Sequence, residues 1–275
     1  MIDIQNISFR YAGSKEMVLQ DFSLQLSENN IYGLLGKNGT GKSTLLYLIS
    51  GLLRPNSGKV SIDGVESFKR VPSTLEEIFI VPEEFDLPAM TLDKYVRINE
   101  PFYPRFNREV LEKCLADFEL PHSLKLDALS MGQKKKVFMS FALAAGTRLL
   151  LMDEPTNGLD IPSKMQFRKV VAGNMSDDRI LIISTHQVHD VEALLDHILI
   201  LTRNRLLLNA SVEDICQRYA FEYRMPGMPL DDVLYSEPSM QGNAVVSMRK
   251  EGGVETPLNL ELLFNAVTMG KINQF

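Results

Sequence analysis

Short apolar runs recur along the chain and alternate with segments whose apolar residues follow a helical period. The runs read IYGLL, LLLM, ILIIS and HILIL at residues 31–35, 149–152, 180–184 and 197–201. Runs of this kind are typical of parallel strands that are buried on both faces of a sheet. The hydrophobic pattern therefore predicts an α/β core.

Two further units are expected beside this core. The N-terminal segment MIDIQNISFRY alternates apolar and polar residues, and turn signals follow at RPNSG (54–58) and Asp63-Gly64, which indicates an antiparallel β subdomain. From Thr91 to about Ala128 the pattern changes. In the segment REVLEKCLADFEL the apolar residues fall on one helical face, so this region is predicted to be a helical insertion.

The last part of the chain differs in composition. After about Glu213 prolines become frequent, and the segment NLELLFNAVT is expected to form a helix. We therefore predict a main domain over 1–212, which contains a helical subdomain at about 84–142, and a small C-terminal subdomain over 213–275.

Charge and cysteine content narrow the function classes. The 275 residues carry a formal net charge of -6, which argues against an electrostatic grip on nucleic acid or anionic lipid. The basic run Lys134-Lys135-Lys136 is expected to be a solvated helix face. Cys114 and Cys216 lie far apart and outside any metal-ligand spacing, so we expect reduced thiols in a cytosolic protein.

No secretory signal and no membrane span are expected. The N-terminal segment lacks a basic region followed by an apolar one. The most apolar stretch, residues 138–152, is interrupted by Thr147 and Arg148 and is shorter than the roughly 18 residues that a span needs. A membrane role would therefore require a partner chain.

The segment GKNGTGKST, residues 36–44, follows the first apolar run and precedes the apolar segment LLYLIS. It fits the pattern G-x-x-x-x-G-K-[ST]. In this pattern glycines turn backbone N–H groups inward, the next helix adds its positive N-terminal end, and the lysine adds a full charge. A strand before and a helix after the motif favour a phosphate-binding loop over a simple glycine-rich turn.

A second motif, LLLMDE, ends a buried strand with two carboxylates. Magnesium on a phosphate prefers hard oxygen ligands, which Ser43 and Asp153 can supply directly or through water. Glu154 is then placed to polarise an attacking water molecule.

Three further motifs occur in order along the chain. They read LSMGQKKK at 129–136, NGLD at 157–160 and STH at 184–186. With these motifs the sequence resembles the ATP-binding subunits of ABC transporters, whose signature reads LSGGQ at the first of these places. The resemblance covers roughly residues 1–210. It implies a P-loop NTPase core that hydrolyses ATP, with ATP and Mg²⁺ as cofactors.

The resemblance also implies roles for single residues. Lys42 would hold the β- and γ-phosphates, Ser43 and Asp153 would hold magnesium, and both Lys42 and Glu154 would act in catalysis. His186 would be the switch histidine that contacts the γ-phosphate. The other loop residues would bind the nucleotide through N–H groups or a hydroxyl: Gly36, Asn38, Gly39, Thr40, Gly41 and Thr44.

Aromatic and histidine residues have structural alternatives. Tyr11 resembles the aromatic residue on which the family stacks adenine, and the alternative is a strand-end aromatic in the core. His122, His189 and His197 are expected to be structural.

Part of the site would come from a second subunit. In the family, the signature residues act on the ATP that the opposite subunit holds, and here these are Ser130, Gly132 and Gln133. A helix N-terminus at this place would present free N–H groups to a γ-phosphate. Asp160 would lie in the loop that crosses the seam. The resemblance thus implies a head-to-tail dimer, with itself or with a paired ATPase subunit, around two ATP.

The sequence departs from the family at two positions. Met131 replaces the first signature glycine, and we expect tolerance because Gly132 is retained. Glu83 replaces the glutamine that follows the strand IFIVP. Its carboxylate can serve the nucleotide's magnesium, but it has no N–H to donate and adds negative charge. Because Glu84 follows directly, the register is open by one residue.

The C-terminal helix and the stretch FYPRFNREVLEKCLADFELP resemble the ATPase subunits of bacterial ABC-2-type exporters. Such a subunit would be cytoplasmic and would lie on the inner face of the membrane through a separate transmembrane subunit. The docking surface is expected over Glu84 to Tyr95. The apolar residues of this segment would either receive a helix or form the insertion's own core: Phe85, Leu87, Met90 and Leu92.

Two other functions remain as alternatives. One is a soluble ABC ATPase that acts on nucleic acid or ribosomes, which the acidic balance and the lack of sustained heptads disfavour. The other is an ATP-binding switch with little turnover, which Glu83 suggests and the retained Glu154 and His186 disfavour.

Overall fold

The computed structural model describes residues 1–121, 123–240, 242–250 and 252–272. Its central sheet has the strand order β10-β9-β3-β8-β7-β6, in which β10 alone runs antiparallel to its neighbour. The predicted parallel core is confirmed, because the four apolar runs form β3, β7, β8 and β9. The strands are β3 (Asn30–Leu35), β6 (Ile78–Val81), β7 (Leu149–Asp153), β8 (Ile180–Thr185), β9 (His197–Thr202) and β10 (Arg205–Ser211).

An antiparallel sheet in the order β2-β1-β4-β5 forms the predicted β subdomain. Helix α1 (Lys42–Ile49) contacts β4 of this sheet and β7 of the central sheet. The turn between β4 and β5 has positive φ at Asp63 and Gly64, as a type I′ hairpin turn requires. The strands are β1 (Ile2–Phe9), β2 (Leu19–Leu26), β4 (Ser57–Ile62) and β5 (Val65–Glu66), and α2 (Pro72–Leu75) leads to β6.

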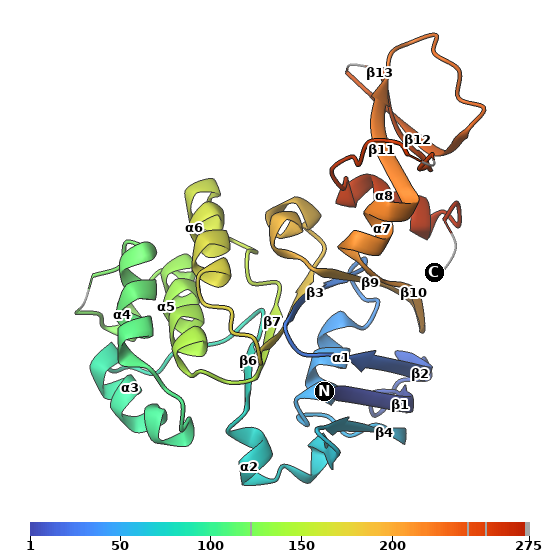
Figure 1. Ribbon diagram of the computed structural model, residues 1–275. Helices are drawn as coiled ribbons and strands as arrows, with labels where there is room; N and C mark the ends of the chain where they lie inside the picture. The colour runs from blue at the N-terminus through green and yellow to red at the C-terminus, as the bar shows by residue number, and fades with distance from the viewer. Residues whose placement is uncertain (122, 241, 251, 273–275) are drawn as a thin grey trace.

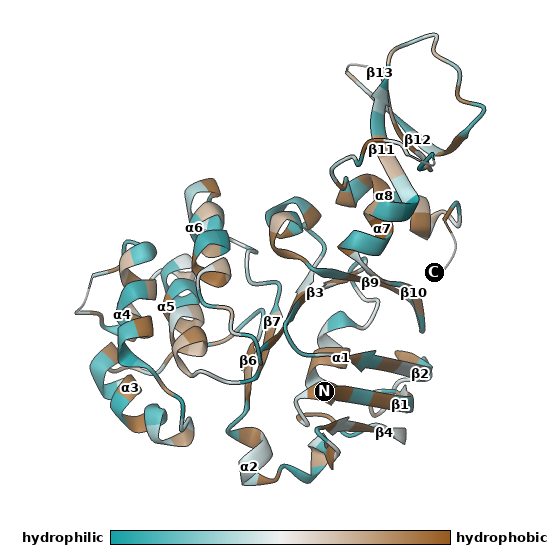
Figure 2. Cartoon of the chain, in the orientation of Figure 1, coloured by the Kyte–Doolittle hydropathy of each residue, from teal (hydrophilic) through white to brown (hydrophobic). Residues whose placement is uncertain are grey.

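Helices α3, α4 and α5, on the other side of the central sheet, lie in the region predicted to be a helical insertion, and α6 packs beside α4 (Figure 1). The predicted apolar face of the second of these helices is buried at Leu111, Cys114 and Leu115. Figure 2 shows the central strands mostly in brown and α4 and α6 in mixed teal and brown. The buried positions of α6, such as Phe167 and Val170, are likewise mostly apolar. The helices are α3 (Leu92–Asn99), α4 (Arg108–Asp117), α5 (Met131–Ala144) and α6 (Ile161–Ala172).

The C-terminal segment forms a small sheet, in the order β11-β13-β12, that projects from the body of the molecule (Figure 1). The predicted C-terminal helix is confirmed as α8, which packs on β12 and β13. Its buried residues, among them Leu263, share one hydrophobic cluster with Ile198 and Ile200 of β9. The elements are α7 (Val212–Arg218), β11 (Tyr219–Arg224), β12 (Val233–Ser239), β13 (Gly242–Met248) and α8 (Leu260–Thr268).

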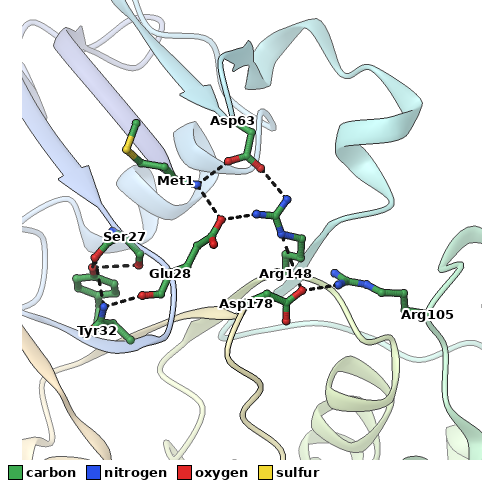
Figure 3. Close-up of polar contacts among 9 residues, drawn as sticks. Met1, Ser27, Glu28, Tyr32, Asp63, Arg105, Arg148 and Asp178 are labelled. Atoms are coloured by element: carbon green, nitrogen blue, oxygen red, sulfur yellow. Dashed lines mark hydrogen bonds and ion pairs between the residues drawn. The ribbon is translucent and has the colours of Figure 1, made fainter.

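Ion pairs between two arginines and several carboxylates join the subdomains (Figure 3). Arg148, just before β7, pairs with Glu28 and, at 2.9 Å, with Asp63 of the β4–β5 turn. Arg105, between α3 and α4, pairs at 2.6 Å with Asp178, which also lies 4.0 Å from Arg148. Segments of the antiparallel sheet, the central sheet and the helical insertion are thus tied together at one place.

Within the residues that the structure describes, no helix combines the length and the apolar character needed to cross a bilayer.

Candidate active site

The carboxyl ends of three parallel strands, β3, β7 and β8, bring the sequence motifs together. The register pairs Leu35 of β3 with Thr185 of β8, and Asp153 of β7 with Ser184 of β8. Since parallel strands end at the same edge of a sheet, the segments that follow them converge there. The phosphate-loop motif, the two carboxylates and the switch histidine therefore meet, although they lie far apart in the sequence.

The loop from Gly36 to Lys42 has the conformation that its glycines allow. Gly39 and Gly41 have φ values of 80° and 99°, which residues with a Cβ rarely adopt. A Cβ at Gly36 would lie 2.6 Å from Thr40 Oγ1, so a side chain there is excluded. Lys42 Nζ donates to the carbonyl oxygen of Gly36 at 2.8 Å, and the ammonium group stays inside the loop.

A cavity of about 470 Å³ lies over this loop. Most of the predicted nucleotide-binding residues line it, whereas Gly36, Thr40 and Asp153 are not among the lining residues. Two lining residues, Val18 and Asn157, were not among the predicted site residues. Asn157 stands in the NGLD motif, which therefore held the signal, and no motif marks Val18. The lining residues are Tyr11, Val18, Asn38, Gly39, Gly41, Lys42, Ser43, Thr44, Glu83, Glu154, Asn157 and His186.

Glu154 is buried, and its carboxylate is held from three directions. It accepts hydrogen bonds from Thr185 Oγ1 at 3.1 Å and from His186 Nδ1 at 2.9 Å, and it lies 3.5 Å from Lys42 Nζ. Its φ is 45°, in the left-handed region, which costs a residue with a Cβ about 1–3 kcal/mol. Such strain is concentrated at functional sites, because the surrounding contacts must enforce it.

Asp153 is buried beside two hydroxyl groups and is not among the residues that line the cavity. Ser184 and Ser43 both donate hydrogen bonds to it. Burial nevertheless raises the pKa of this carboxyl, and the nearby charges of Glu154 and Glu83 raise it further. A site with oxygen donors and surplus negative charge fits a hard cation such as Mg²⁺.

The described residues contain no group of three or more His, Cys, Asp or Glu side chains arranged around a metal.

Tyr11 lines the cavity two residues beyond the end of β1. The side chain is 43% exposed and its hydroxyl lies 2.9 Å from Thr44 Oγ1. Its ring packs edge to face against Phe9, with 5.0 Å between centroids. The alternative of a core aromatic is therefore wrong, because the ring faces the cavity and solvent.

The open register at Glu83 is resolved by the structure. Glu83 lines the cavity and accepts a hydrogen bond from Asn157 Nδ2 at 2.8 Å, whereas Glu84 is exposed. The carboxylate thus has a donor from the segment that follows β7.

The predicted signature residues lie outside the chain's own cavity. Ser130 caps α5, accepting from the backbone N–H of Gln133 at 3.3 Å, while Gln133 Oε1 accepts from the N–H of Ser130 at 3.1 Å. Asp160 caps α6 in the same way through Ser163. Ser130, Gln133 and Asp160 are exposed, and neither they nor Gly132 line the cavity.

Two interpretations from the sequence are corrected or narrowed. Lys135 is buried, with 4% of its surface exposed, so the basic run is not a solvated helix face. In the segment expected to receive a partner helix, Leu87 and Leu92 are buried in the protein's own core, and Phe85 stacks on Phe138. The own-core alternative therefore holds for these side chains.

The remaining histidines take part in surface and structural contacts. His189 Nε2 lies 2.7 Å from Glu261 of α8, and His197 Nε2 lies 2.7 Å from Asn209 of the neighbouring strand. Burial lowers the pKa of His197. His122 falls outside the described residues.

Comparison with known proteins decides the family. The family described as ABC transporter matches residues 19–157. The chain is an ABC transporter ATP-binding subunit. It is 30% identical to the ABC transporter ATP-binding protein YtrB of Bacillus subtilis, over 80% of this chain and 75% of that protein. It is 31% identical to the bacitracin transport ATP-binding protein BcrA of Bacillus licheniformis, over 71% of this chain and 65% of that protein.

Solved structures of ABC ATPases share the fold. The structure of an ATP-binding subunit of an ABC transporter superposes with a TM-score of 0.70 at 25% identity, over 78% of this chain and 91% of the other. A bacterial ABC transporter cassette solved as a dimer gives a TM-score of 0.67 at 25% identity, over 77% of this chain and 99% of the other. The P-loop NTPase fold expected from the sequence is thus confirmed, and the chain is an ATPase that couples hydrolysis to transport.

Proposed function

We propose that this ATPase works as a head-to-tail dimer around two ATP molecules and drives a separate membrane subunit that exports its substrate. The observation that supports this proposal is that the phosphate loop and the signature residues lie apart in one chain. One chain supplies the phosphate loop and Glu154, whereas its signature residues lie at the start of α5 and do not line that cavity, with Ser130 and Gln133 exposed. A second copy turned head to tail would place Ser130 and Gly132 against the nucleotide of the first.

Each residue of the cavity has a distinct task in this scheme. Lys42 binds the β- and γ-phosphates, and Tyr11 offers its ring to adenine. Mg²⁺, bound with the nucleotide, would be held by Ser43, Asp153 and Glu83 and would neutralise phosphate charge. The loop N–H groups of residues 36–44 complete the cradle.

Glu154 acts as general base on the attacking water molecule. A carboxylate oxygen only accepts hydrogen bonds, so the Nδ1 of His186 donates to Glu154 and fixes its orientation. The opposite edge of the ring, with Nε2, remains directed away from Glu154 and is the part of His186 that contacts the γ-phosphate.

The docking surface for the membrane subunit is assigned to a cavity of about 310 Å³ between the central sheet and the helical insertion. Side chains from α3, α5, β6 and the segment after α1 line it, including Tyr95, Phe138 and the half-exposed Leu52. An apolar groove of this kind suits a helix from a partner chain. Docking there would hold the cytoplasmic subunit on the inner face of the membrane.

Export is supported by the helical region and C-terminal helix, and by relatives whose names refer to bacitracin transport and linearmycin resistance. We propose that the ATPase domain spans 1–212 and that residues 213–275 form a separate small subdomain. Raised tolerance to bacitracin or linearmycin in cells that express the intact transporter, and not its Glu154→Gln form, would support export. Equal tolerance would count against these substrate classes.

The Glu154→Gln variant tests the dimer mechanism. Loss of a general base costs about 10²- to 10⁴-fold in rate, and the phosphate ligands remain in place. Unhydrolysed ATP should then hold two chains together. With ATP and magnesium, size-exclusion chromatography should show a dimer for the variant and mostly monomer for the wild type.

The control adds Ser130→Arg to Glu154→Gln. A bulky cation at the start of α5 should block the partner's phosphate face and return the protein to monomer. A dimer that is indifferent to ATP and to this change would overturn the mechanism.

Leu52→Glu tests the docking groove, and Val65→Glu on the antiparallel sheet is the matched control. Both positions are exposed, at 52% and 37%, so both variants should fold and keep the ATPase activity of the isolated subunit. Only Leu52→Glu should lose co-purification with the membrane subunit. Retained co-purification would show that the partner docks elsewhere.

A further inference from the structure

Lys135 is a buried lysine that no part of the mechanism above uses. It lies in α5, five residues after the cap Ser130, and only 4% of its surface is exposed. Its neighbour Lys134 keeps its charge near solvent beside the exposed Asp86. Burial of an ammonium group is costly unless nearby groups compensate for the lost water.

The ammonium group of Lys135 binds the backbone that follows β7. Nζ donates to the carbonyl oxygen of Asn157 at 2.8 Å and to that of Glu154 at 3.2 Å. Both hydrogen bonds therefore go to carbonyl groups and neither goes to a carboxylate. Through them α5, which carries the signature residues, is fastened to the segment that holds the general base.

Carboxylates nearby supply the charge that Lys135 balances. Burial lowers the pKa of Lys135, and the charges of Glu83, Glu154 and Asp153 raise it, with Glu83 the strongest of the three. Glu83 is linked to the same segment, because Asn157 Nδ2 donates to its Oε1 at 2.8 Å. Lys135 and Glu83 thus contact the two ends of one residue, Asn157.

We propose that Lys135 is a positioning residue that serves as the counter-charge to Glu83 and fixes the Glu154–Asn157 segment against α5. Without Lys135, the carboxylates of Glu83 and Glu154 would line the phosphate-binding cavity together with Lys42, but without a second buried lysine behind them. With Lys135, the extra negative charge of Glu83 is offset by a buried ammonium group that does not itself line the phosphate-binding cavity. The inference concerns ATP hydrolysis and rests on the proposed roles of Glu83 and Glu154, not on export.

A charge cycle on the isolated subunit tests the counter-charge. The variants are Lys135→Gln, Glu83→Gln and the double variant, and Lys134→Gln is the matched control that removes the same charge one position earlier. The affinity for ATP is measured in EDTA by calorimetry, which requires no turnover and no membrane partner. Kinetics with magnesium then give KM and kcat for the same proteins.

Lys135→Gln should weaken ATP binding about tenfold, because one uncompensated negative charge remains near the phosphates. Glu83→Gln alone should strengthen it, and the double variant should return to within about threefold of wild type. Lys134→Gln should change the affinity by less than about threefold. If the Lys135→Gln variant and the double variant lose the same affinity for ATP, Lys135 is not the counter-charge to Glu83, because Glu83→Gln then restores no affinity.

If Lys135→Gln folds poorly, urea unfolding of the same variants provides a second test. If Lys135→Gln is destabilised because Glu83 loses its counter-charge, adding Glu83→Gln should restore the urea midpoint of unfolding. If the lysine is only structural, the midpoint should not be restored. Lys135→Met, which also removes the donors to the two carbonyl groups, should lower kcat further than Lys135→Gln at a similar KM. An equal kcat in both would contradict the positioning of the Glu154–Asn157 segment.

Discussion

The Gly132→Ala variant separates the proposed action of the signature on a partner's ATP from its place in the fold. Within the chain, a Cβ at Gly132 would lie 3.8 Å from Leu159 Cδ2 and 3.9 Å from the carbonyl oxygen of Gly158, which are ordinary contact distances. Alanine is favoured over glycine inside a helix by about 0.5–1 kcal/mol. The variant should therefore unfold at the wild-type temperature or up to roughly 4 °C above it.

The added methyl group should nevertheless abolish most of the turnover. In the proposed dimer the start of α5 approaches the partner's γ-phosphate, and a methyl group there keeps the backbone N–H groups away. Loss of one such donor typically costs about 10²- to 10³-fold in rate. Phosphate release at saturating ATP should fall by at least 100-fold, while ATP binding to the isolated subunit changes by less than about threefold.

Met131→Gly is the control for this experiment. Met131 is 51% exposed, and the change restores the family's signature at the adjacent position, so activity should stay within a few-fold of wild type. If a well-folded Gly132→Ala variant hydrolyses ATP at the wild-type rate, Gly132 does not contact the nucleotide of the partner subunit. A large drop in its unfolding temperature would instead refute the packing argument.

Further predictions concern the cavity and the buried thiols. Lys42→Ala should weaken ATP binding by about 100-fold or more, because it removes the charge aimed at the phosphates, and near-normal affinity in calorimetry would contradict the assignment. Tyr11→Phe should keep the KM for ATP, whereas Tyr11→Ala should raise it about 5- to 150-fold through lost stacking, and equal values for both would exclude the adenine contact. Burial raises the pKa of Cys114 to about 11, so its thiol should be protonated at about pH 8 and resist a disulfide reagent until the protein unfolds. Rapid labelling of folded protein at Cys114, mapped by mass spectrometry, would refute its burial.

The sequence was most informative where a residue type is required by one particular structure. Glycines that need positive φ, such as Gly39 and Gly41, and apolar runs buried on both faces gave the loop and the parallel core directly. Because the strands are parallel, their carboxyl ends meet, which explains why Glu154 lies beside His186 in the structure. From the sequence, the role of His186 rested on the family resemblance alone.

Contacts between distant segments could not be predicted in this way. The three lysines of the basic run are identical in type, and only the segment lying over α5 decides that Lys135 turns inward. The partner of Glu83 is Asn157, 74 positions away in the sequence, so no local pattern reveals it. The apolar residues Leu87 and Leu92 fit both a docking surface and a core, and packing alone settles their place.

The ion pairs around Asp178 hold the segment against which the C-terminal end of α5 packs. A Cβ at Gly146, just after the helix, would lie 2.5 Å from the carbonyl oxygen of Arg105, so the C-terminal end of α5 abuts the residue that those ion pairs hold. The helix has 14 residues and is therefore about 21 Å long. A turn of about 5° at the held end displaces Ser130 by about 2 Å over that length. High salt screens exposed ion pairs, so it would weaken the ion pairs at the C-terminal end of α5 and leave the helix itself intact.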